Sequence, residues 1–234
     1  MNLLDFEGDY GRTYDTHIEG LIPAYSALFE IAAATAAALQ ARAQRVLVVG
    51  PGSGTELPGL LGAMPEASFT LVEPSEQMRG QCQGLIERIG AGARVQWAEL
   101  NQLEAGGFEA VISHNVLHVL APDAQAPLLE QMVRRVGPGG ILLLSSYSET
   151  PALPLPLAMA IATARFRALG MDEPTVQAVM ASRNSKVFSL DHALLERTLH
   201  EAGLEPPTQL LQALFTHLWV SRRPPLQCEG GPDA

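Results

Sequence analysis

The stretch from Val46 to Glu56 reads VLVVGPGSGTE, and the expected organisation of the chain follows from it. Four apolar residues, most of them β-branched, run into glycines at positions 50, 52 and 54, and a segment that can start a helix comes next. This order predicts a buried strand, a tight turn and a helix N-terminus. Free backbone N–H groups at such a turn can hold an anionic or polar group, so a nucleotide-like ligand is expected there.

Strand and helix patterns alternate along the chain around this turn. Further strands are predicted at residues 68–72, 94–98, 108–113 and 140–146, the last after a Gly-Pro-Gly-Gly turn at 137–140. Helices are predicted at residues 25–43, 55–64, 75–89, 123–136 and 189–203, and two short antiparallel edge strands at 209–222. Alternation of this kind indicates parallel βαβ units sandwiched between helices. We expect a doubly wound, mostly parallel α/β sheet that binds its ligand at the carboxyl ends of the strands.

The alternation stops between residues 150 and 186, and this interruption sets the expected domain organisation. Prolines there lead into two apolar helices, at 157–169 and 174–182, which predict a helical lid inserted after the fifth strand. The apolar composition favours a pocket for a partly hydrophobic small molecule, or alternatively a homodimer interface. We expect a single domain over residues 1–223, in which residues 1–43 form an N-terminal cap and helix, and a flexible tail over 224–234.

Composition excludes several classes of protein. The net charge of −10 argues against a nucleic-acid partner, because phosphate-backbone binding needs clustered cations. Cys82 and Cys228 show neither metal-type spacing nor a disulfide framework, which favours a reducing, cytoplasmic location. The N-terminus has acids where a signal peptide has basic residues, and the Ala-rich stretch 31–39 is too short to span a membrane. No membrane partner is expected.

Glycine spacing and one acidic residue narrow the expected ligand. A dinucleotide fingerprint, G-x-G-x-x-G, needs glycine at position 55, where this chain has Thr55, and no lysine follows the turn as a P-loop requires. A short-chain reductase would need a Tyr-x-x-x-Lys pair, but the only lysine, Lys186, follows Ser182 by four residues. Glu73 ends the second strand, about 20 residues past the glycines, where an acid accepts hydrogen bonds from ribose hydroxyls. A ligand with a single ribose is therefore favoured.

These motifs together resemble those of the class I S-adenosylmethionine-dependent methyltransferases. VLVVGPGSG is similar to their first motif, LVEPSEQM (71–78) to their second, SHNVLHVL (113–120) to their fourth-strand motif, and RRVGPGGILLL (134–144) to their fifth-strand turn and strand. The flank YDTHIEGLIPAY (14–25) is similar to the branch that includes carboxy-S-adenosylmethionine synthase. The resemblance implies a Rossmann-like methyltransferase fold with a seven-stranded sheet, and S-adenosylmethionine as cofactor.

The resemblance also implies where the cofactor binds, residue by residue. It places the methionine moiety at Gly50, Pro51, Gly52 and Gly54, the ribose at Glu73, the adenine near Pro74 and Met78, the adenine edge at Glu99 and Leu100, and the methionine portion above Asn115 and Val116.

Methyl transfer from a sulfonium is an in-line displacement that needs alignment and desolvation more than acid or base groups. A base helps only if the acceptor must first lose a proton. The candidates for catalysis are His118, Tyr14 and His17, and those for substrate contact are Tyr147 and Arg183; packing or surface roles are the alternative for each. His114 and His118 lie four residues apart, but no third ligand accompanies them, so no metal is predicted.

The favoured function is methyl transfer to an O, N or S atom of a small molecule. One alternative is an enzyme like carboxy-S-adenosylmethionine synthase, which relies on a lid arginine to hold the extra carboxylate of its cofactor. That position falls near Met180 in this chain, and Arg183 is out of register, which favours the ordinary cofactor. The other alternative is a protein that binds S-adenosylmethionine without catalysis.

Overall fold

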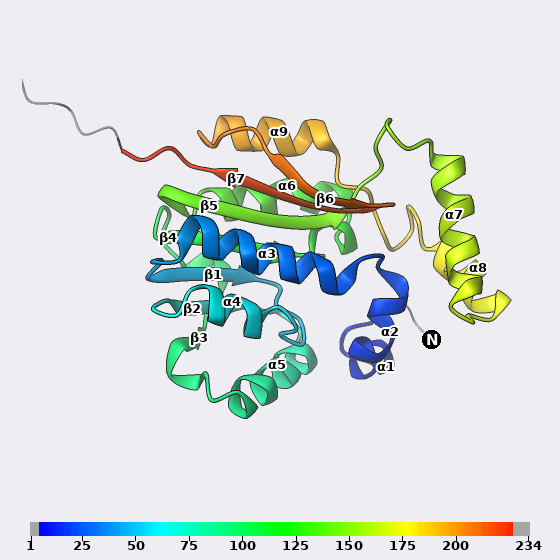
Figure 1. The fold of residues 1–234 in the computed structure, drawn as a ribbon, viewed down its shortest axis with the longest axis horizontal. Coiled ribbons are helices and arrows are strands. Elements are labelled where there is room, and N and C mark those ends of the chain that lie inside the picture. Colours follow the sequence, from blue (N-terminus) through cyan, green and yellow to red (C-terminus); the bar gives the residue numbers. More distant parts are fainter. Residues whose placement is uncertain (1–4, 227–234) are drawn as a thin grey trace, which may run out of the picture.

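A seven-stranded sheet forms the centre of the computed structural model, which describes residues 5–226 (Figure 1). The strands are β1 (Arg45–Val49), β2 (Ser68–Val72), β3 (Val95–Trp97), β4 (Phe108–His114), β5 (Val136–Tyr147), β6 (Thr208–Ala213) and β7 (Thr216–Arg222). Their order in the sheet is β3-β2-β1-β4-β5-β7-β6. The first five strands pair in parallel, whereas β7 is antiparallel to both β5 and β6. The predicted mostly parallel, doubly wound sheet is thereby confirmed.

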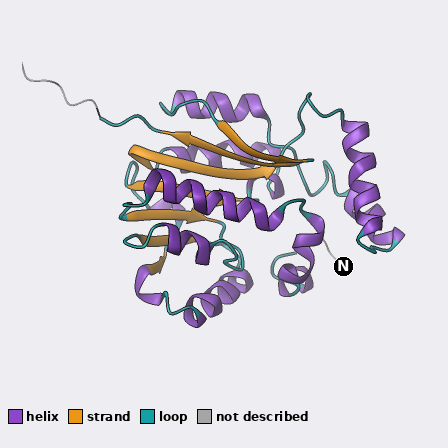
Figure 2. Cartoon of the chain, in the orientation of Figure 1, coloured by secondary structure: helices purple, strands orange, loops and turns teal. Residues whose placement is uncertain are grey.

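Helices cover both faces of this sheet (Figure 2). They are α1 (Asp9–Arg12), α2 (Tyr14–Leu21), α3 (Tyr25–Gln40), α4 (Leu57–Ala63), α5 (Glu76–Arg88), α6 (Pro122–Val133), α7 (Leu155–Ala168), α8 (Glu173–Ala181) and α9 (His192–Glu201). The helices α3, α4 and α5 pack on one face, and α6 and α9 pack on the other. The helices α7 and α8, inserted after β5 where a lid is predicted and called the lid helices, lie at one end of the sheet, close to α2.

The central strand β1 shows why the fold follows from its sequence. Val46 and Val48 pack into the core under α4 and α5, and Leu47 and Val49 pack into the core under α6 and α9. Successive side chains of a strand point to opposite faces, so a strand covered on both faces needs an unbroken apolar run. All four side chains are at most 4% exposed, as this requirement demands.

Capping side chains fix where three of the helices begin. Ser75 Oγ accepts a hydrogen bond from the backbone N–H of Met78 at 3.2 Å, which starts α5 at the predicted position. Asp172 and Asp191 cap α8 and α9 in the same way. Each satisfies a backbone N–H that has no partner within the helix.

Three local features differ from the sequence prediction. The predicted turn at 137–140 lies inside β5, which begins at Val136, and the β4–β5 register shifts there as in a bulge. A Cβ on Gly140 would lie 2.9 Å from the carbonyl oxygen of Glu109 in β4, so this glycine permits close strand packing and does not end the strand. Strand β7 is internal, because the hairpin inserts it between β5 and the true edge strand β6. Residues 9–21 form two short helices that the sequence pattern did not reveal.

The remaining predictions on organisation concern the chain ends and membranes. Residues 224–226 have no regular structure, and the rest of the predicted tail, 227–234 with Cys228, lies outside the described residues. Within residues 5–226, no single helix is long and apolar enough to cross a membrane. The pair α2 and α3, bent by 91° at their junction, passes that test by length and composition only.

Candidate functional site

The residues expected to contact the cofactor follow four neighbouring parallel strands. The glycine turn follows β1, Glu73 follows β2, Glu99 follows β3 and Asn115 follows β4. In the sheet these strands lie in the order β3-β2-β1-β4, and the carboxyl ends of parallel strands meet at one edge. The structure therefore brings these segments to a common edge of the sheet, although they are spread over 66 residues of sequence (50 to 115).

Gly50 must be glycine for two reasons. Its φ angle is +72°, a left-handed conformation that side chains with a Cβ rarely adopt. A Cβ at this position would also lie 2.3 Å from Cγ2 of Val116, the residue that follows Asn115 at the end of β4. The N–H of Gly50 donates to the carbonyl of Val72 at 2.8 Å, which ties the turn to the end of β2. The turn is therefore held rigidly between two neighbouring strand ends.

Glu73 joins the glycine turn to the start of α5. Its Oε2 accepts from the Gly52 N–H and its Oε1 accepts from the Ser75 N–H, each at 3.0 Å. Burial raises the pKa of Glu73 above its ordinary value, and the two backbone hydrogen bonds oppose that shift. Each carboxylate oxygen has a second lone pair, so the half-buried group can still accept hydrogen bonds from a diol.

The other expected cofactor residues differ in how far they are buried. Met78 is 1% exposed, and its Cε lies 3.5 Å from where a Cβ on Gly52 would be, so it packs beneath the turn. Pro51 is buried, Leu100 is half-buried, and Pro74 and Glu99 are exposed. Pro74 and Glu99 therefore lie at the surface of the protein, beside the edge of the sheet.

The N-terminal helices pack against the glycine turn and α5. Ser53 Oγ donates to Asp15 Oδ1 at 2.6 Å, and Gln81 donates from Nε2 to the Gly11 carbonyl at 2.8 Å. Tyr14 lies edge-on to Tyr10, with ring centroids 5.9 Å apart, and shares a side-chain hydrogen bond with Tyr25. Burial holds the pKa of Tyr14 well above its ordinary value, so its hydroxyl stays protonated.

Glu56, the last residue of the opening stretch, belongs to this cluster and was missed as a site residue. It is 5% exposed, and burial together with the nearby charge of Glu73 raises its pKa to about 8. Its charge also contributes to the raised pKa values of Tyr14 and Tyr25. The signal in the sequence was an acid that directly precedes the apolar segment 57–61, where a helix facing the core has no place for an unpaired charge.

His17 and His114 lie in contrasting surroundings. His17 lies on the exposed side of α2, where its Nδ1 donates to the Thr13 carbonyl at 2.8 Å. His114 is buried edge-on to Phe29, burial lowers its pKa to about 3, and neither ring nitrogen has a hydrogen-bond partner among the described residues. Over residues 5–226, no group of three or more His, Cys, Asp or Glu residues could hold a metal ion.

A cavity of about 160 Å³ lies between α2, the two lid helices and the β6–β7 turn. Its wall is mainly apolar and includes Ile18, Ile22, Met159, Phe166, Met180 and Phe215. Asn115 and His118, which follow β4, line it at the sheet edge. The cavity thus adjoins the predicted cofactor edge through the segment after β4.

Both predicted substrate residues, Tyr147 and Arg183, line this cavity, and both bond to Glu149. Arg183 donates from Nε and Nη2 to the two Glu149 carboxylate oxygens, each at 2.7 Å, and the Tyr147 hydroxyl donates to Oε1 at 2.9 Å. The hydrogen bonds from Arg183 hold the pKa of Glu149 below its ordinary value, so the pair is ionised. The charge of Arg183 is therefore already balanced within the protein.

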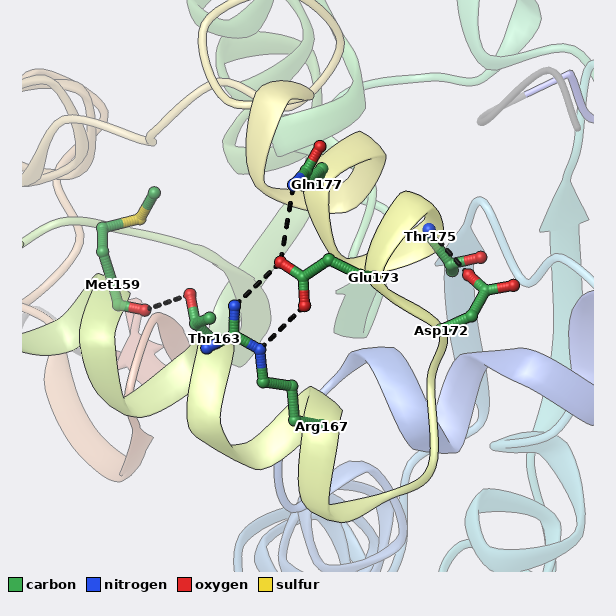
Figure 3. Close-up of polar contacts among 7 residues, drawn as sticks. All are labelled: Met159, Thr163, Arg167, Asp172, Glu173, Thr175 and Gln177. Atoms are coloured by element: carbon green, nitrogen blue, oxygen red, sulfur yellow. Dashed lines mark hydrogen bonds and ion pairs between the residues drawn. The ribbon is translucent and has the colours of Figure 1, made fainter.

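Polar contacts also connect the two lid helices on their outer side (Figure 3). Arg167 of α7 donates to both carboxylate oxygens of Glu173 of α8, at 2.9 and 2.8 Å. This pair is about half exposed, and such pairs contribute little to stability. Burial of Phe166 and Val176 between the helices holds the lid together to a greater extent. Arg165 joins the lid to α2 by donating to the Gly20 carbonyl at 2.6 Å.

This geometry defines a class of protein: a doubly wound α/β domain with a half-buried acid at its strand ends and a mainly apolar cavity beside it. Comparison with known proteins agrees with this description. Residues 47–142 match the methyltransferase domain family. The carboxy-S-adenosyl-L-methionine synthase of Campylobacter concisus (strain 13826) is 21% identical over 141 residues, which are 60% of this chain and 60% of that relative.

Solved structures share the fold at low sequence identity. An O-methyltransferase family protein from Burkholderia thailandensis superposes with a TM-score of 0.62 at 18% identity, covering 86% of this chain and 57% of that one. The carbon methyltransferase CurJ gives 0.62 at 14% identity, covering 91% and 58%. Magnesium protoporphyrin IX methyltransferase from Synechocystis PCC 6803, with bound SAM, gives 0.59 at 13% identity and covers 93% of each chain. At these identities the likeness concerns the fold.

The match of residues 47–142 to a methyltransferase domain and the shared fold agree with the resemblance of the motifs to the class I S-adenosylmethionine-dependent methyltransferases. S-adenosylmethionine is the cofactor of this class. The chain spans 60% of the length of the Campylobacter relative and 57% of the Burkholderia protein.

Proposed function

We propose that the protein transfers the methyl group of S-adenosylmethionine, by in-line displacement, to an O, N or S atom of a small, largely apolar molecule bound in the lid cavity. The observation that carries this proposal is the continuity of the two sites. Val116 packs against Gly50 of the glycine turn, and its neighbour Asn115 lines the cavity. A methyl donor at the turn and an acceptor in the cavity would therefore meet at the end of β4.

Residues at the sheet edge fit the proposed cofactor. The Glu73 carboxylate has free lone pairs for ribose hydroxyls, and the glycine turn leaves the backbone open to close approach. When bound, S-adenosylmethionine supplies an electrophilic methyl group on a sulfonium. The chain's own contribution is alignment and exclusion of water, which are the main requirements of such a displacement.

Asn115 has the geometry of a residue held in place for function. Its φ angle of +60° is uncommon for a residue with a side chain, and strain of this kind clusters at binding sites. Its backbone N–H donates to the Ser145 carbonyl at 3.0 Å, which holds the conformation. Asn115 would thus position both ligands from one rigid point.

The carboxylated cofactor is a less suitable candidate for this chain, although the Campylobacter relative is a carboxy-S-adenosyl-L-methionine synthase. An extra carboxylate needs an arginine without a partner, and the lid residue Arg183 is already bonded to Glu149.

Tyr14 remains a candidate for cofactor or substrate contact from the N-terminal cap. The exposed lid residues Leu157, Ile161 and Leu169 are compatible with a homodimer, which stays a prediction, as does the cytoplasmic location.

Isothermal calorimetry tests the cofactor site. Replacing Glu73 by Ala is expected to weaken S-adenosylmethionine binding roughly tenfold or more, because charge-assisted hydrogen bonds are lost. Glu130→Ala, an exposed acid on α6, is the matched control and should leave the affinity unchanged. Equal affinities for the two variants would refute the ribose assignment. Formation of S-adenosylhomocysteine only in the presence of an acceptor would separate an enzyme from a protein that merely binds the cofactor.

A further inference from the structure

His118 lies where the lid cavity meets the sheet. It belongs to the short 3₁₀ turn Leu117–Val119 after β4, is 9% exposed and lines the cavity. Its backbone carbonyl accepts from the Phe188 N–H at 2.8 Å, and its ring packs against β5. The ring therefore has one edge fixed against the sheet and the opposite edge toward the cavity.

The contacts of this ring determine its tautomer. The backbone N–H of Tyr147 donates to Nδ1 at 3.2 Å, and a backbone N–H can only donate, so Nδ1 is the unprotonated nitrogen. Ser146 Oγ lies 3.5 Å from the same nitrogen. Burial lowers the pKa of His118 to about 4, so the ring is neutral near pH 7. A neutral ring with a bare Nδ1 carries its proton on Nε2.

Other polar groups of the cavity also offer donors. Ser145 Oγ lies 3.4 Å from Asn115 Oδ1, an arrangement that directs the Asn115 amide nitrogen elsewhere as a donor. Arg183 and Arg165 already donate to Glu149 and to the Gly20 carbonyl. No Asp or Glu is among the described residues that line the cavity. The lining therefore contains hydrogen-bond donors but no evident proton acceptor at its polar end.

The volume of the cavity indicates the size of the group that fits within it. The cavity volume is about 160 Å³. An engineered apolar protein cavity of about 150 Å³ is known to hold benzene, so the space corresponds to roughly one six-membered ring. A carboxylate there would have to lose its hydration and to compete with Glu149 for Arg183 and with the backbone carbonyls of Gly20 and Glu19 for Arg165, which is costly.

We propose that His118 binds the methyl acceptor as a hydrogen-bond donor through Nε2–H and does not remove a proton from the acceptor. The acceptor is then a compact, one-ring-sized molecule with an oxygen at the His118 end and no carboxylate. This inference rests on the proposed function for the role of the bound molecule as acceptor. The tautomer of His118 and the ligand preference of the cavity follow from contacts within the protein, and neither requires a bound cofactor.

Two measurements on the full chain test it. Long-range ¹H–¹⁵N NMR of the ligand-free protein reports the tautomer directly, with the His118 signals assigned by their loss in His118→Gln. Calorimetry on protein saturated with S-adenosylhomocysteine compares acetophenone, which carries an oxygen acceptor, with toluene and benzoate. We expect the Nε2–H tautomer at pH 7, acetophenone binding at least tenfold tighter than toluene, and no benzoate binding.

Two substitutions distinguish a donor from a base. The Gln amide nitrogen can occupy the position of Nε2 and donate, but it cannot act as a base; Asn is too short to reach that position. His118→Gln is expected to bind acetophenone within about threefold of the wild type, and His118→Asn about tenfold more weakly. Thermal unfolding of each variant checks that it folds, and His118→Asn supplies the NMR assignment if His118→Gln does not fold.

The Nδ1–H tautomer, equal acetophenone affinity in His118→Asn and wild type, or tighter binding of benzoate than of acetophenone would each overturn the proposal. Failure of S-adenosylhomocysteine to bind would instead overturn the proposed function, because the tautomer and acetophenone binding can be measured without it.

Discussion

The cofactor edge and the lid cavity adjoin each other but are built in different ways. At the cofactor edge, each contact surface is a short continuous segment at the end of a strand, such as the glycine turn after β1 or Glu73 to Met78 after β2. The cavity wall combines residues from distant parts of the chain, including Ile18, His118, Phe166 and Phe215. The first site therefore depends on backbone conformation at a few positions, whereas the second depends on how the lid and the cap pack.

Gly50→Ala tests this comparison with the largest expected effect. The new Cβ would lie 2.3 Å from Val116 at a φ of +72°, so we expect a loss of about 3 kcal/mol in unfolding free energy and loss of cofactor binding. Gly62→Ala is the matched control, since nothing lies within 4 Å of that Cβ on helix α4, and it should be neutral or stabilising. Urea denaturation measures both, and similar losses in the two variants would contradict the role of the turn.

Glu56→Gln tests whether a buried charge beside the glycine turn lowers stability. Such an effect depends on pH, whereas the packing of the lid does not. The pKa of Glu56 is raised from 4.5 to about 8 in the folded protein, so the folded state binds more protons than the unfolded state between these values. The contribution of protonated Glu56 to the free energy of unfolding is fully present below pH 4.5 and is lost as the pH rises through 8. We expect Glu56→Gln to stabilise the protein by on the order of 3 kcal/mol at pH 8 and to have little effect at pH 4.

Unfolding curves at the two pH values measure this effect. An exposed acid, replaced as Glu130→Gln, is the control and should show no such dependence on pH. A stabilisation of Glu56→Gln that is the same at pH 4 and pH 8 would show that charge burial is not its cause.

Glu149→Gln probes the polar end of the cavity and should have a smaller effect. It leaves the partly buried Arg183 without its bidentate partner, at a cost of about 1–2 kcal/mol in unfolding free energy. Because the freed guanidinium lines the cavity, we also expect benzoate to bind to this variant and not to the wild type. Calorimetry with benzoate decides this, and S-adenosylmethionine binding should be unchanged, since Glu149 lies outside the cofactor edge.

Arg167→Ala should have the smallest effect of the series. The Arg167–Glu173 pair on the outer side of the lid is about half exposed, and pairs of this kind contribute little to stability. We expect no measurable loss in unfolding free energy, at low or at high salt. A loss as large as that of Phe166→Ala, which opens a hole between the lid helices, would mean that the ion pair and not apolar packing holds the lid.

Local patterns in the sequence predicted the elements of the sheet well, because strands and helices follow from the period of apolar residues. Strand β2 and the cap of α5 at Ser75 were placed to the residue. The errors occurred where a local signal has two physical meanings. Glycines at 137–140 can make a turn or permit close strand packing, and only the position of β4 decides that they do the second.

The candidate site was predictable in part for a similar reason. Residues at strand ends could be assigned because the parallel order of the sheet brings them together whatever their side chains do. Arg183 and His118 could be assigned to the region of the cavity, but not their states: the sequence does not reveal that Glu149 neutralises one or that the Tyr147 N–H fixes the tautomer of the other. Glu56 was missed because its burial, at 5% exposed, depends on the packing around the glycine turn and not on a pattern along the chain.

The sequence alone thus determined the sheet, the glycine turn and the position of Glu73 at a strand end, since these depend on backbone geometry and on the spacing of residues along one strand–turn–helix unit. The tertiary structure decided the size of the acceptor cavity, the charge available in it and the direction of its hydrogen bonds. These properties arise from contacts between residues far apart in the chain, such as Tyr147 with His118 and Glu149 with Arg183, and no local pattern encodes them.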